Sequence, residues 1–194
     1  MKNAFNGTMN DEECFNHELS IGVHLDNTSF LELYKSTTKE ILSMTGAKTF
    51  LDCGGGVGAY TKAMLEQGID CTYVDLSKIH FDYVSKNLKP INDTQSLQIF
   101  NLDFTKQKFK AFDLVASIEV MEHIEDERLI AFLKNLKCNY FHFSSTPEKT
   151  DFDKAWGHIN IKSEDEWIEL FENCGFKLER KLNLPTTWSL LFTK

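Results

Sequence analysis

The sequence lacks the features of a secreted, membrane-spanning or disulfide-stabilised protein. Its five cysteines stand singly, without the paired spacing of a zinc site or the density of a disulfide framework, so we expect reduced thiols. No apolar run approaches the roughly 20 residues that a membrane helix requires, and the opening MKNAFN is not a signal peptide. These absences predict a cytoplasmic protein without a membrane span.

Basic side chains are also few. The chain has 21 lysines and arginines against 29 acids, which gives a net charge of −8. Nonspecific affinity for nucleic acid depends on clustered Lys and Arg, so this balance disfavours a nucleic-acid partner, although a local patch such as Lys106, Lys108 and Lys110 leaves one possible. A small-molecule substrate is the default expectation, and the sequence assigns no oligomeric state.

Proline occurs three times, and no repeat, low-complexity tract or linker divides the 194 residues. That length is enough for one well-formed hydrophobic core. Residues 1–28 are polar, rich in acids and without a clear period, so we expect an N-terminal tail or cover. We expect residues 29–194 to form a single domain.

Residues 49–60, TFLDCGGGVGAY, predict a strand, a tight turn and the start of a helix. Glycines permit positive φ and close approach to a ligand, and the N-terminus of the next helix offers unpaired N–H groups. We interpret the stretch as a cofactor turn. Gly54-x-Gly56-x-x-Ala59, with Asp75 near the expected offset, also fits a dinucleotide pattern, which leaves an NAD-dependent oxidoreductase open.

Strand and helix patterns alternate along the rest of the chain, which predicts an α/β fold with a parallel sheet covered on both faces. The predicted helices span a segment capped by Asp26 or Asn27 and ending at Gly46, then 60–66, 77–88, 127–136 and 164–174. After the strand that enters the glycines, the predicted strands are 70–74, 97–102, 112–117, 140–144, 176–184 and 187–192. The last two have only a short connection, broken by Pro185, so they must form an antiparallel hairpin at one edge.

Three features outside the glycines narrow the interpretation. Asp52 stands directly before the turn, a third strand ends in Asp103-Phe104, and the closing hairpin is not part of a dinucleotide fold. The run DCGGGVG matches Asp/Glu-x-Gly-x-Gly-x-Gly without a gap, so the chain resembles the class I S-adenosylmethionine-dependent methyltransferases from about Phe30 to Lys194. Residues 112–124 are similar to the fourth-strand segment of the ubiquinone-biosynthesis-like O-methyltransferases.

The resemblance implies a Rossmann-like, doubly wound seven-stranded sheet that binds S-adenosylmethionine and releases S-adenosylhomocysteine. It implies a cofactor site of turn glycines and strand-end residues: Asp52, Gly54, Gly56, Gly58, Asp75, Leu76, Asp103, Phe104, Ser117 and Ile118. Asp52 would lie near the ammonium group, and Asp75 would accept from both ribose hydroxyls, since a carboxylate offers several acceptor sites. Leu76 would pack on adenine, Asp103 would accept from its amino group, and Ser117 and Ile118 would line the sulfonium.

Methyl transfer from a sulfonium is an in-line displacement, so the protein aligns the acceptor and, for a hydroxyl, removes its proton. His123 and His158 are the candidate bases because imidazole titrates near neutrality, and Glu122 joins them as a candidate catalytic residue. His142 alternates within an aromatic strand and is predicted to pack in the core. We expect Tyr34, Trp156 and Asn160 to contact the acceptor, a small molecule methylated on oxygen.

Glu119, Glu122 and His123 form an i, i+3, i+4 set that a helical turn would present on one face, where His158 could complete a divalent-metal site. Some RNA 2′-O-methyltransferases and some quinone O-methyltransferases have a similar grouping, so a metal-dependent RNA enzyme remains an alternative. The same residues also serve as capping and dipole partners at a helix start. A cofactor-binding protein without turnover is a further hypothesis.

Overall fold

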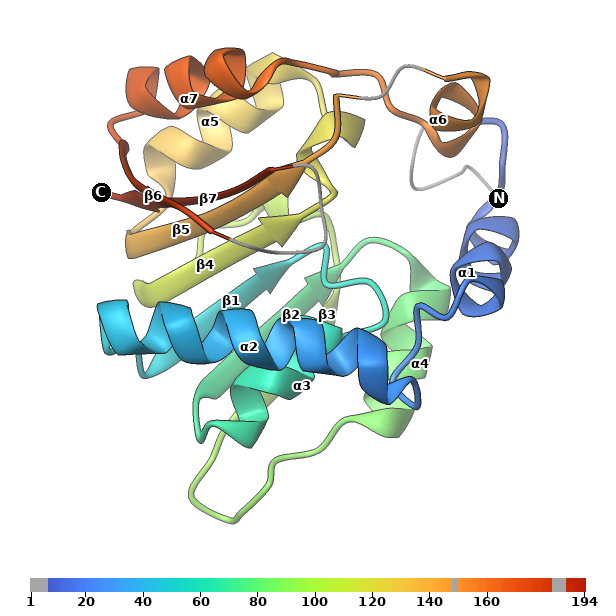
Figure 1. Cartoon of the computed structure of the whole chain (residues 1–194), viewed down its shortest axis with the longest axis vertical. Helices are drawn as coiled ribbons and strands as arrows, with labels where there is room; N and C mark the ends of the chain where they lie inside the picture. Colours follow the sequence, from blue (N-terminus) through green and yellow to red (C-terminus); the bar gives the residue numbers. More distant parts are fainter. Residues whose placement is uncertain (1–6, 148–149, 183–187) are drawn as a thin grey trace.

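The computed structural model describes residues 7–147, 150–182 and 188–194 (Figure 1). Within these residues one sheet has seven strands in the order β3-β2-β1-β4-β5-β7-β6. The strands are β1 (Thr49–Cys53), β2 (Asp70–Asp75), β3 (Leu97–Asn101), β4 (Phe112–Ile118), β5 (Cys138–Ser145), β6 (Lys177–Lys181) and β7 (Trp188–Thr193). Strands β1 to β5 are parallel, while β7 runs antiparallel to both β5 and β6. The predicted sheet and its closing hairpin are confirmed.

Helices cover both faces of the sheet. On one face lie α2 (Thr28–Thr45), α3 (Ala59–Glu66) and α4 (Lys78–Asn87), and on the other α5 (Asp126–Asn135) and α7 (Glu164–Asn173) (Figure 1). Two further helices, α1 (Asp11–Ser20) and α6 (Asp151–Trp156), lie beyond the carboxyl ends of the parallel strands. Short 3₁₀ turns follow two strands, η1 (Phe104–Lys106) after β3 and η2 (Met121–His123) after β4. No helix among the described residues is long and apolar enough to cross a membrane.

Local sequence signals set several of these boundaries. The Asn27 side chain accepts a hydrogen bond from the Phe30 amide and caps α2, and Gly46 ends that helix at a φ of 61°. Ser163 and Glu166 form the predicted capping box at the start of α7. The predicted break at Pro185 lies outside the described residues.

Helix α1 was not foreseen, because the acid-rich segment before residue 28 has no hydrophobic period. Asn10 and Glu13 form a capping box that satisfies the first amides of the helix. Of the residues of α1, all of which the structure describes, only Cys14 is buried. The helix is thus defined by its cap and its tertiary contacts, and we propose that residues 1–28 act as a cover over a domain formed by residues 29–194.

The core is divided between the two faces of the sheet. On the α5 and α7 face, Phe141, Phe143, Trp167 and Phe171 are fully buried, and Phe171 stacks on Phe192 with ring centroids 4.3 Å apart.

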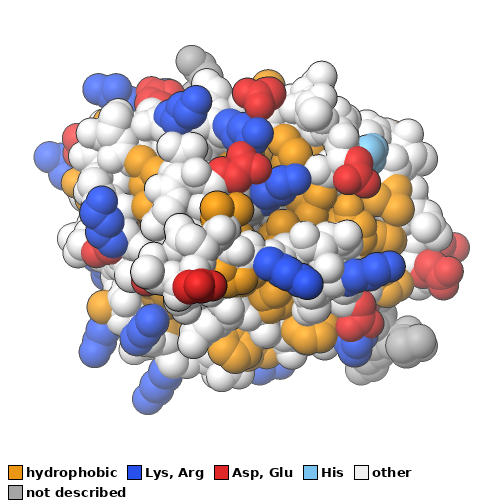
Figure 2. Space-filling model, turned by 90° about the horizontal axis from the view of Figure 1, so that it is seen from below, with side chains coloured by type: hydrophobic (Ala, Val, Ile, Leu, Met, Phe, Trp, Pro, Cys, Tyr) orange, Lys and Arg blue, Asp and Glu red, His pale blue; other side chains and the backbone are white. Residues whose placement is uncertain are grey.

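The surface of the molecule seen from below Figure 1 has charged side chains of both signs with hydrophobic ones between them (Figure 2). This mixture of signs gives that face no uniform attraction for a polyanion.

A row of hydrogen-bonded, buried polar side chains lies on the other face of the sheet, beneath α2 and α3. The Tyr60 hydroxyl lies 2.7 Å from His142 Nδ1, and His142 Nε2 lies 2.7 Å from Ser189 Oγ. His142 is fully buried, as predicted, and burial lowers its pKa to about 3. The imidazole is therefore neutral in the folded protein at neutral pH.

This depressed pKa predicts acid sensitivity. The unfolded chain takes up a proton at this histidine as pH falls below its ordinary pKa of 6.5, whereas the folded chain does not, so stability is lost in that direction. Between about pH 7 and pH 5, wild type should lose about 2 kcal/mol more unfolding free energy than a His142→Gln variant. Urea denaturation at each pH measures the difference. A His24→Gln variant should track wild type, and parallel curves for wild type and His142→Gln would contradict the assignment.

Candidate functional site

The glycine turn after β1 takes a conformation that only glycine adopts readily. Gly54 and Gly56 have φ values of 75° and 52°. A Cβ on Gly54 would lie 2.6 Å from a methyl group of Val120, whereas a Cβ on Gly56 would meet nothing within 4 Å. Gly54 is therefore required by close packing, while Gly56 faces open space and leaves its backbone exposed to a ligand.

The Asp75 carboxylate is held by two backbone amides at the carboxyl end of β2. Gly56 N–H donates to Oδ2 at 2.9 Å and Ser77 N–H donates to Oδ1 at 2.7 Å. The residue is 5% exposed, and burial raises its pKa in spite of the nearby His80 and these amides. The carboxylate is thus fixed in orientation before any ligand binds.

Asp52, the acid inside β1, is almost fully buried beneath the turn. Its Oδ2 accepts a hydrogen bond from Thr61 Oγ1 at 2.6 Å. Burial raises the pKa of the carboxyl to about 7, more than the Thr61 hydrogen bond lowers it. A cationic ligand at this position would stabilise the ionised form of Asp52, and the ionised carboxylate would in turn strengthen binding of that ligand.

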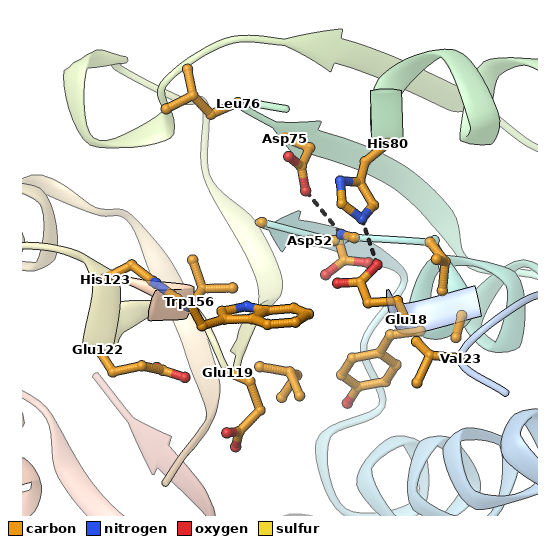
Figure 3. A pocket seen from close by; sticks show the side chains of 18 of the residues that line it. Glu18, Val23, Asp52, Asp75, Leu76, His80, Glu119, Glu122, His123 and Trp156 are labelled. Atoms are coloured by element: carbon orange, nitrogen blue, oxygen red, sulfur yellow. Dashed lines mark hydrogen bonds and ion pairs between the residues drawn. The ribbon is translucent and has the colours of Figure 1, made fainter. Parts of the chain in front are cut away.

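A cavity of about 440 Å³ opens at these strand ends (Figure 3). Its walls come from the glycine turn, the ends of β2 and β4, and helices α1, α2 and α6. Most of the predicted cofactor residues line it: Asp52, Gly54, Gly56, Asp75, Leu76, Asp103, Phe104 and Ile118. The other two do not, because Gly58 precedes α3 as its N-cap and Ser117 is fully buried in β4.

Asp103 has protein partners of its own. Arg128 Nη2 lies 2.6 Å from its Oδ2 and Lys106 Nζ lies 3.0 Å from the same atom, while Thr105 donates to Oδ1. Partial burial opposes ionisation, but these donors outweigh it and hold the pKa of Asp103 below its ordinary value. Sequence reasoning did not identify Arg128, which reaches the site because α5 packs against η1.

At the opposite end of the cavity the structure brings together Glu122, His123 and His158. One ligand atom from each lies within 4.8 Å of the others. The two imidazole rings meet edge-on with centroids 4.7 Å apart. The amides of Ile159 and Asn160 both donate to the Glu122 carbonyl, which pins the loop carrying His158 against η2. His123 and His158, which are 35 positions apart in the sequence, thus share one site.

The Glu122 carboxyl is fully buried. Ser145 Oγ donates to Oε2 at 3.2 Å, while Oε1 has no hydrogen-bond partner among the described residues. Burial first, and then the nearby Glu119 charge, raise the pKa of Glu122 well above its ordinary value. Such a group readily holds a proton or accepts a cation.

The expectation for Glu119 needs correction. Glu119 has a φ of 54°, lies between the end of β4 and the start of η2, and is not part of the cluster. Its Oε1 accepts a hydrogen bond from Ser144 Oγ at 2.6 Å. The i, i+3, i+4 pattern fails because the helical turn begins only at Met121, so Glu119 does not share a helical face with the other two.

Two of the three predicted acceptor residues, Tyr34 and Trp156, line the cavity. Trp156 extends across its middle in Figure 3. Asn160 does not line it, because its amide nitrogen donates to the Ile124 carbonyl and to Asp126. Asn160 thus anchors the loop that carries His158. Sequence reasoning expected a tail or cover from residues 1–28 but named none of its residues, and Glu18 of α1 also lines the cavity.

The chain is similar to known methyltransferases in sequence and fold. A family model described as a methyltransferase domain matches residues 51–138, the segment from within β1 to the start of β5. The chain is 29% identical over 132 residues to the mitochondrial ubiquinone biosynthesis O-methyltransferase of Schizosaccharomyces pombe. This match covers 66% of the chain and 48% of the relative, so the chain aligns with about half the length of that protein.

Solved structures with the same fold have lower identity. Magnesium protoporphyrin IX methyltransferase from Synechocystis, crystallised with SAH, superposes with a TM-score of 0.68 at 16% identity over 94% of each chain. The 1,6-didemethyltoxoflavin-N1-methyltransferase of Burkholderia thailandensis superposes with a TM-score of 0.66 at 16% identity, over 95% of this chain and 89% of that one. The chain therefore has the fold of these S-adenosylmethionine-dependent methyltransferases, and its residues 51–138 match a methyltransferase domain model.

Proposed function

We propose that the protein binds S-adenosylmethionine and transfers its methyl group to an oxygen of a small-molecule acceptor, releasing S-adenosylhomocysteine. The observation that carries this proposal is the shared cavity. Its one end has the fixed carboxylates Asp52 and Asp75, and its other end has the Glu122, His123 and His158 cluster. Donor and acceptor can therefore meet within one cavity.

The residues at the first end fit the cofactor. A buried carboxylate such as Asp52, with a pKa of about 7, is stabilised in its charged form by an ammonium group. Asp75 is oriented by two amides and can accept from a vicinal diol. Gly56, beside it, lets the ligand approach the backbone.

The histidines at the second end suit proton removal. In-line displacement at a sulfonium needs an aligned nucleophile, and a hydroxyl becomes a better nucleophile as it loses its proton to a neutral imidazole. His158 Nδ1 lies 3.6 Å from Asp153 Oδ1, and the charge of this carboxylate favours the imidazolium formed by proton transfer. His123, 5% exposed, is the alternative base.

The acceptor proposed is a small ring-shaped molecule. Phe30, Tyr34 and Trp156 line the cavity and offer aromatic surfaces for stacking. Transfer to oxygen is supported by the O-methyltransferase relative from Schizosaccharomyces pombe, whereas the Burkholderia thailandensis neighbour is an N1-methyltransferase. An acceptor screen should therefore include phenols, catechols and ring nitrogens of matched size. Cofactor binding without turnover across this screen would favour the non-catalytic hypothesis.

A divalent cation is compatible with the second end. Two imidazoles and Oε1 of Glu122, which has no hydrogen-bond partner in the described part of the chain, form a donor set that transition metals accept. A bound ion there would act as a Lewis acid toward an acceptor hydroxyl. This donor set is also the observation that favours the second candidate, a metal-dependent RNA 2′-O-methyltransferase. The net charge of −8 weighs against that candidate. The match of residues 51–138 to a methyltransferase domain model and the β5-β7-β6 arrangement weigh against the oxidoreductase alternative.

The ribose assignment predicts a large effect of Asp75→Ala on cofactor affinity. Loss of two charge-assisted hydrogen bonds should weaken S-adenosylmethionine binding by on the order of 2 kcal/mol, or about 30-fold. Isothermal titration calorimetry measures the change. Asp82→Ala, an exposed substitution on α4, is the matched control and should bind as wild type does. An unchanged affinity in Asp75→Ala would show that this carboxylate does not hold the ribose.

The base assignment predicts that His123→Gln or His158→Gln lowers kcat by about 100-fold while cofactor affinity is retained. The variant that removes the base should also lose the acidic limb of the pH–rate profile, since protonation of that imidazole no longer limits turnover. Steady-state kinetics across pH give both readouts. If both variants keep full turnover near neutral pH, neither histidine is the base.

The metal hypothesis predicts that Mn²⁺ titrated into the protein binds with measurable heat, and that Glu122→Gln abolishes this binding. Glu127→Gln, an exposed neighbour in α5, should bind Mn²⁺ as wild type does. Activity should fall in chelator and return with Mn²⁺ or Mg²⁺. Full activity in chelator together with no heat of binding would establish metal-independent transfer, and preference for a short single-stranded RNA over catechols would favour the second candidate.

A further inference from the structure

Helix α1 forms part of the cavity wall, although it lies outside the alternating strand–helix order. Its residues Glu18 and His17, and Ile21 directly after it, line the cavity together with the glycine turn and Asp75. The glycine turn and the strand-end acids lie elsewhere in the chain, so they do not account for the contacts of α1.

Towards the cofactor end, α1 is joined to α4 by an ion pair. Glu18 Oε2 lies 2.6 Å from His80 Nε2, and the side chain of His80 is 1% exposed against 19% for Glu18. Phe15 packs edge-on against both His80 and Tyr83, with ring centroids 5.2 and 5.4 Å away. The Tyr83 hydroxyl accepts from the Leu25 amide, which ties the chain after α1 to the same helix.

His80 also lies within electrostatic reach of Asp75. Burial alone would lower the pKa of His80, but the hydrogen bond and charge of Glu18, followed by the charges of Asp75 and Asp11, outweigh it and raise the pKa above 6.5. The His80 charge in turn favours the ionised form of Asp75. Figure 3 shows His80 beside Asp75 with its ring directed to Glu18.

Towards the acceptor end, α1 is joined to α6. His17 packs against Phe152 and Trp156 with ring centroids 5.0 and 5.3 Å away. The amides of Thr8 and Met9 both donate to the Ala155 carbonyl. The helix thus spans the cavity from the α4 side to the α6 side, over the position proposed for the cofactor (Figure 1).

We propose that Glu18 is a positioning residue for the cofactor: through the His80 imidazolium it supports the charge of the Asp75 carboxylate and holds α1 closed over the ribose end of the cavity. This inference rests on the proposed function, because it assigns the ribose to Asp75. The chain Glu18–His80–Asp75 alternates negative, positive and negative charge, so each member stabilises the charged form of the next. Cofactor affinity and closure of α1 then depend on the same proton.

The sign of the pH dependence follows from the groups that face His80, which are Glu18 and Asp11 from α1 and Asp75 from β2. Because the pKa of His80 is raised in the closed state, the stabilisation is fully present below its ordinary value of 6.5 and is lost as pH rises through the raised pKa. Affinity for the cofactor should therefore decline on the alkaline side. This limb belongs to His80 and not to Asp52, whose protonation acts on the acidic side.

Binding of S-adenosylhomocysteine, measured by calorimetry between about pH 6 and pH 9, tests the proposal. Glu18→Gln keeps a hydrogen bond to the imidazole but removes the charge, and should weaken binding about tenfold at neutral pH. It should also move the alkaline limb to lower pH, and His80→Gln should remove that limb. The double variant should bind no more weakly than His80→Gln, since the two residues act in one chain. Glu12→Gln, an exposed position on the same helix, should match wild type.

Hydrogen exchange of the α1 amides without ligand separates this inference from the proposed function. Exchange in residues 12–20 should be faster in Glu18→Gln than in wild type and in Glu12→Gln, whether or not any acceptor is methylated. Equal exchange, an unchanged pH profile of binding in Glu18→Gln, or additive effects in the double variant would each overturn the proposal. Failure of the wild-type protein to bind S-adenosylhomocysteine would instead overturn the proposed function.

Discussion

The hydrogen bond from the Gly56 amide to the Asp75 carboxylate joins the turn after β1 to the end of β2, and the cofactor end of the cavity depends on it. Parallel pairing of β1 with β2 places Cys53 opposite Val74, so the two strands end side by side. Tyr73 reinforces the junction by donating its hydroxyl hydrogen to the Gly56 carbonyl at 2.7 Å. Contacts with the neighbouring strand thus hold the turn, in addition to the hydrogen bond from the Gly58 amide to the Gly55 carbonyl within it.

Burial gives the cavity a consistent electrostatic character. Asp52, Asp75 and Glu122 all have their pKa raised, first by removal from water, although each has hydrogen-bond donors beside it. A ligand that carries sulfonium and ammonium charges would lower these pKa values again, because its positive charges stabilise the ionised carboxylates. On the proposed function, cofactor binding and proton release are therefore linked, and the affinity for a cationic ligand exceeds that for a neutral analogue of the same shape.

The fold, and the gathering of most of the proposed cofactor residues around one cavity, could largely be predicted from the sequence, because both follow from local order. A strand, an acid, glycines and a helix specify their own geometry, and the parallel sheet then brings the ends of β1, β2 and β4 to one edge. The other parts depend on tertiary packing. Arg128 reaches Asp103 because α5 packs against η1, and Asn160 is directed away from the cavity to anchor its loop. Glu119 has a positive φ, which no local sequence pattern predicts for a residue other than glycine. Helix α1 has a readable cap but no apolar stripe, so its partners could not be inferred.

The packing of Val120 against Gly54 has a consequence for engineering and for divergence. Val120 belongs to the segment that carries the proposed acceptor-side residues, yet its methyl groups lie where a side chain on Gly54 of the proposed cofactor turn would be. A larger residue at this position, introduced to change acceptor choice, would press on the backbone that receives the cofactor. New acceptor specificities in this scaffold are therefore more accessible through α6 and the His158 loop, which can vary without displacing the turn.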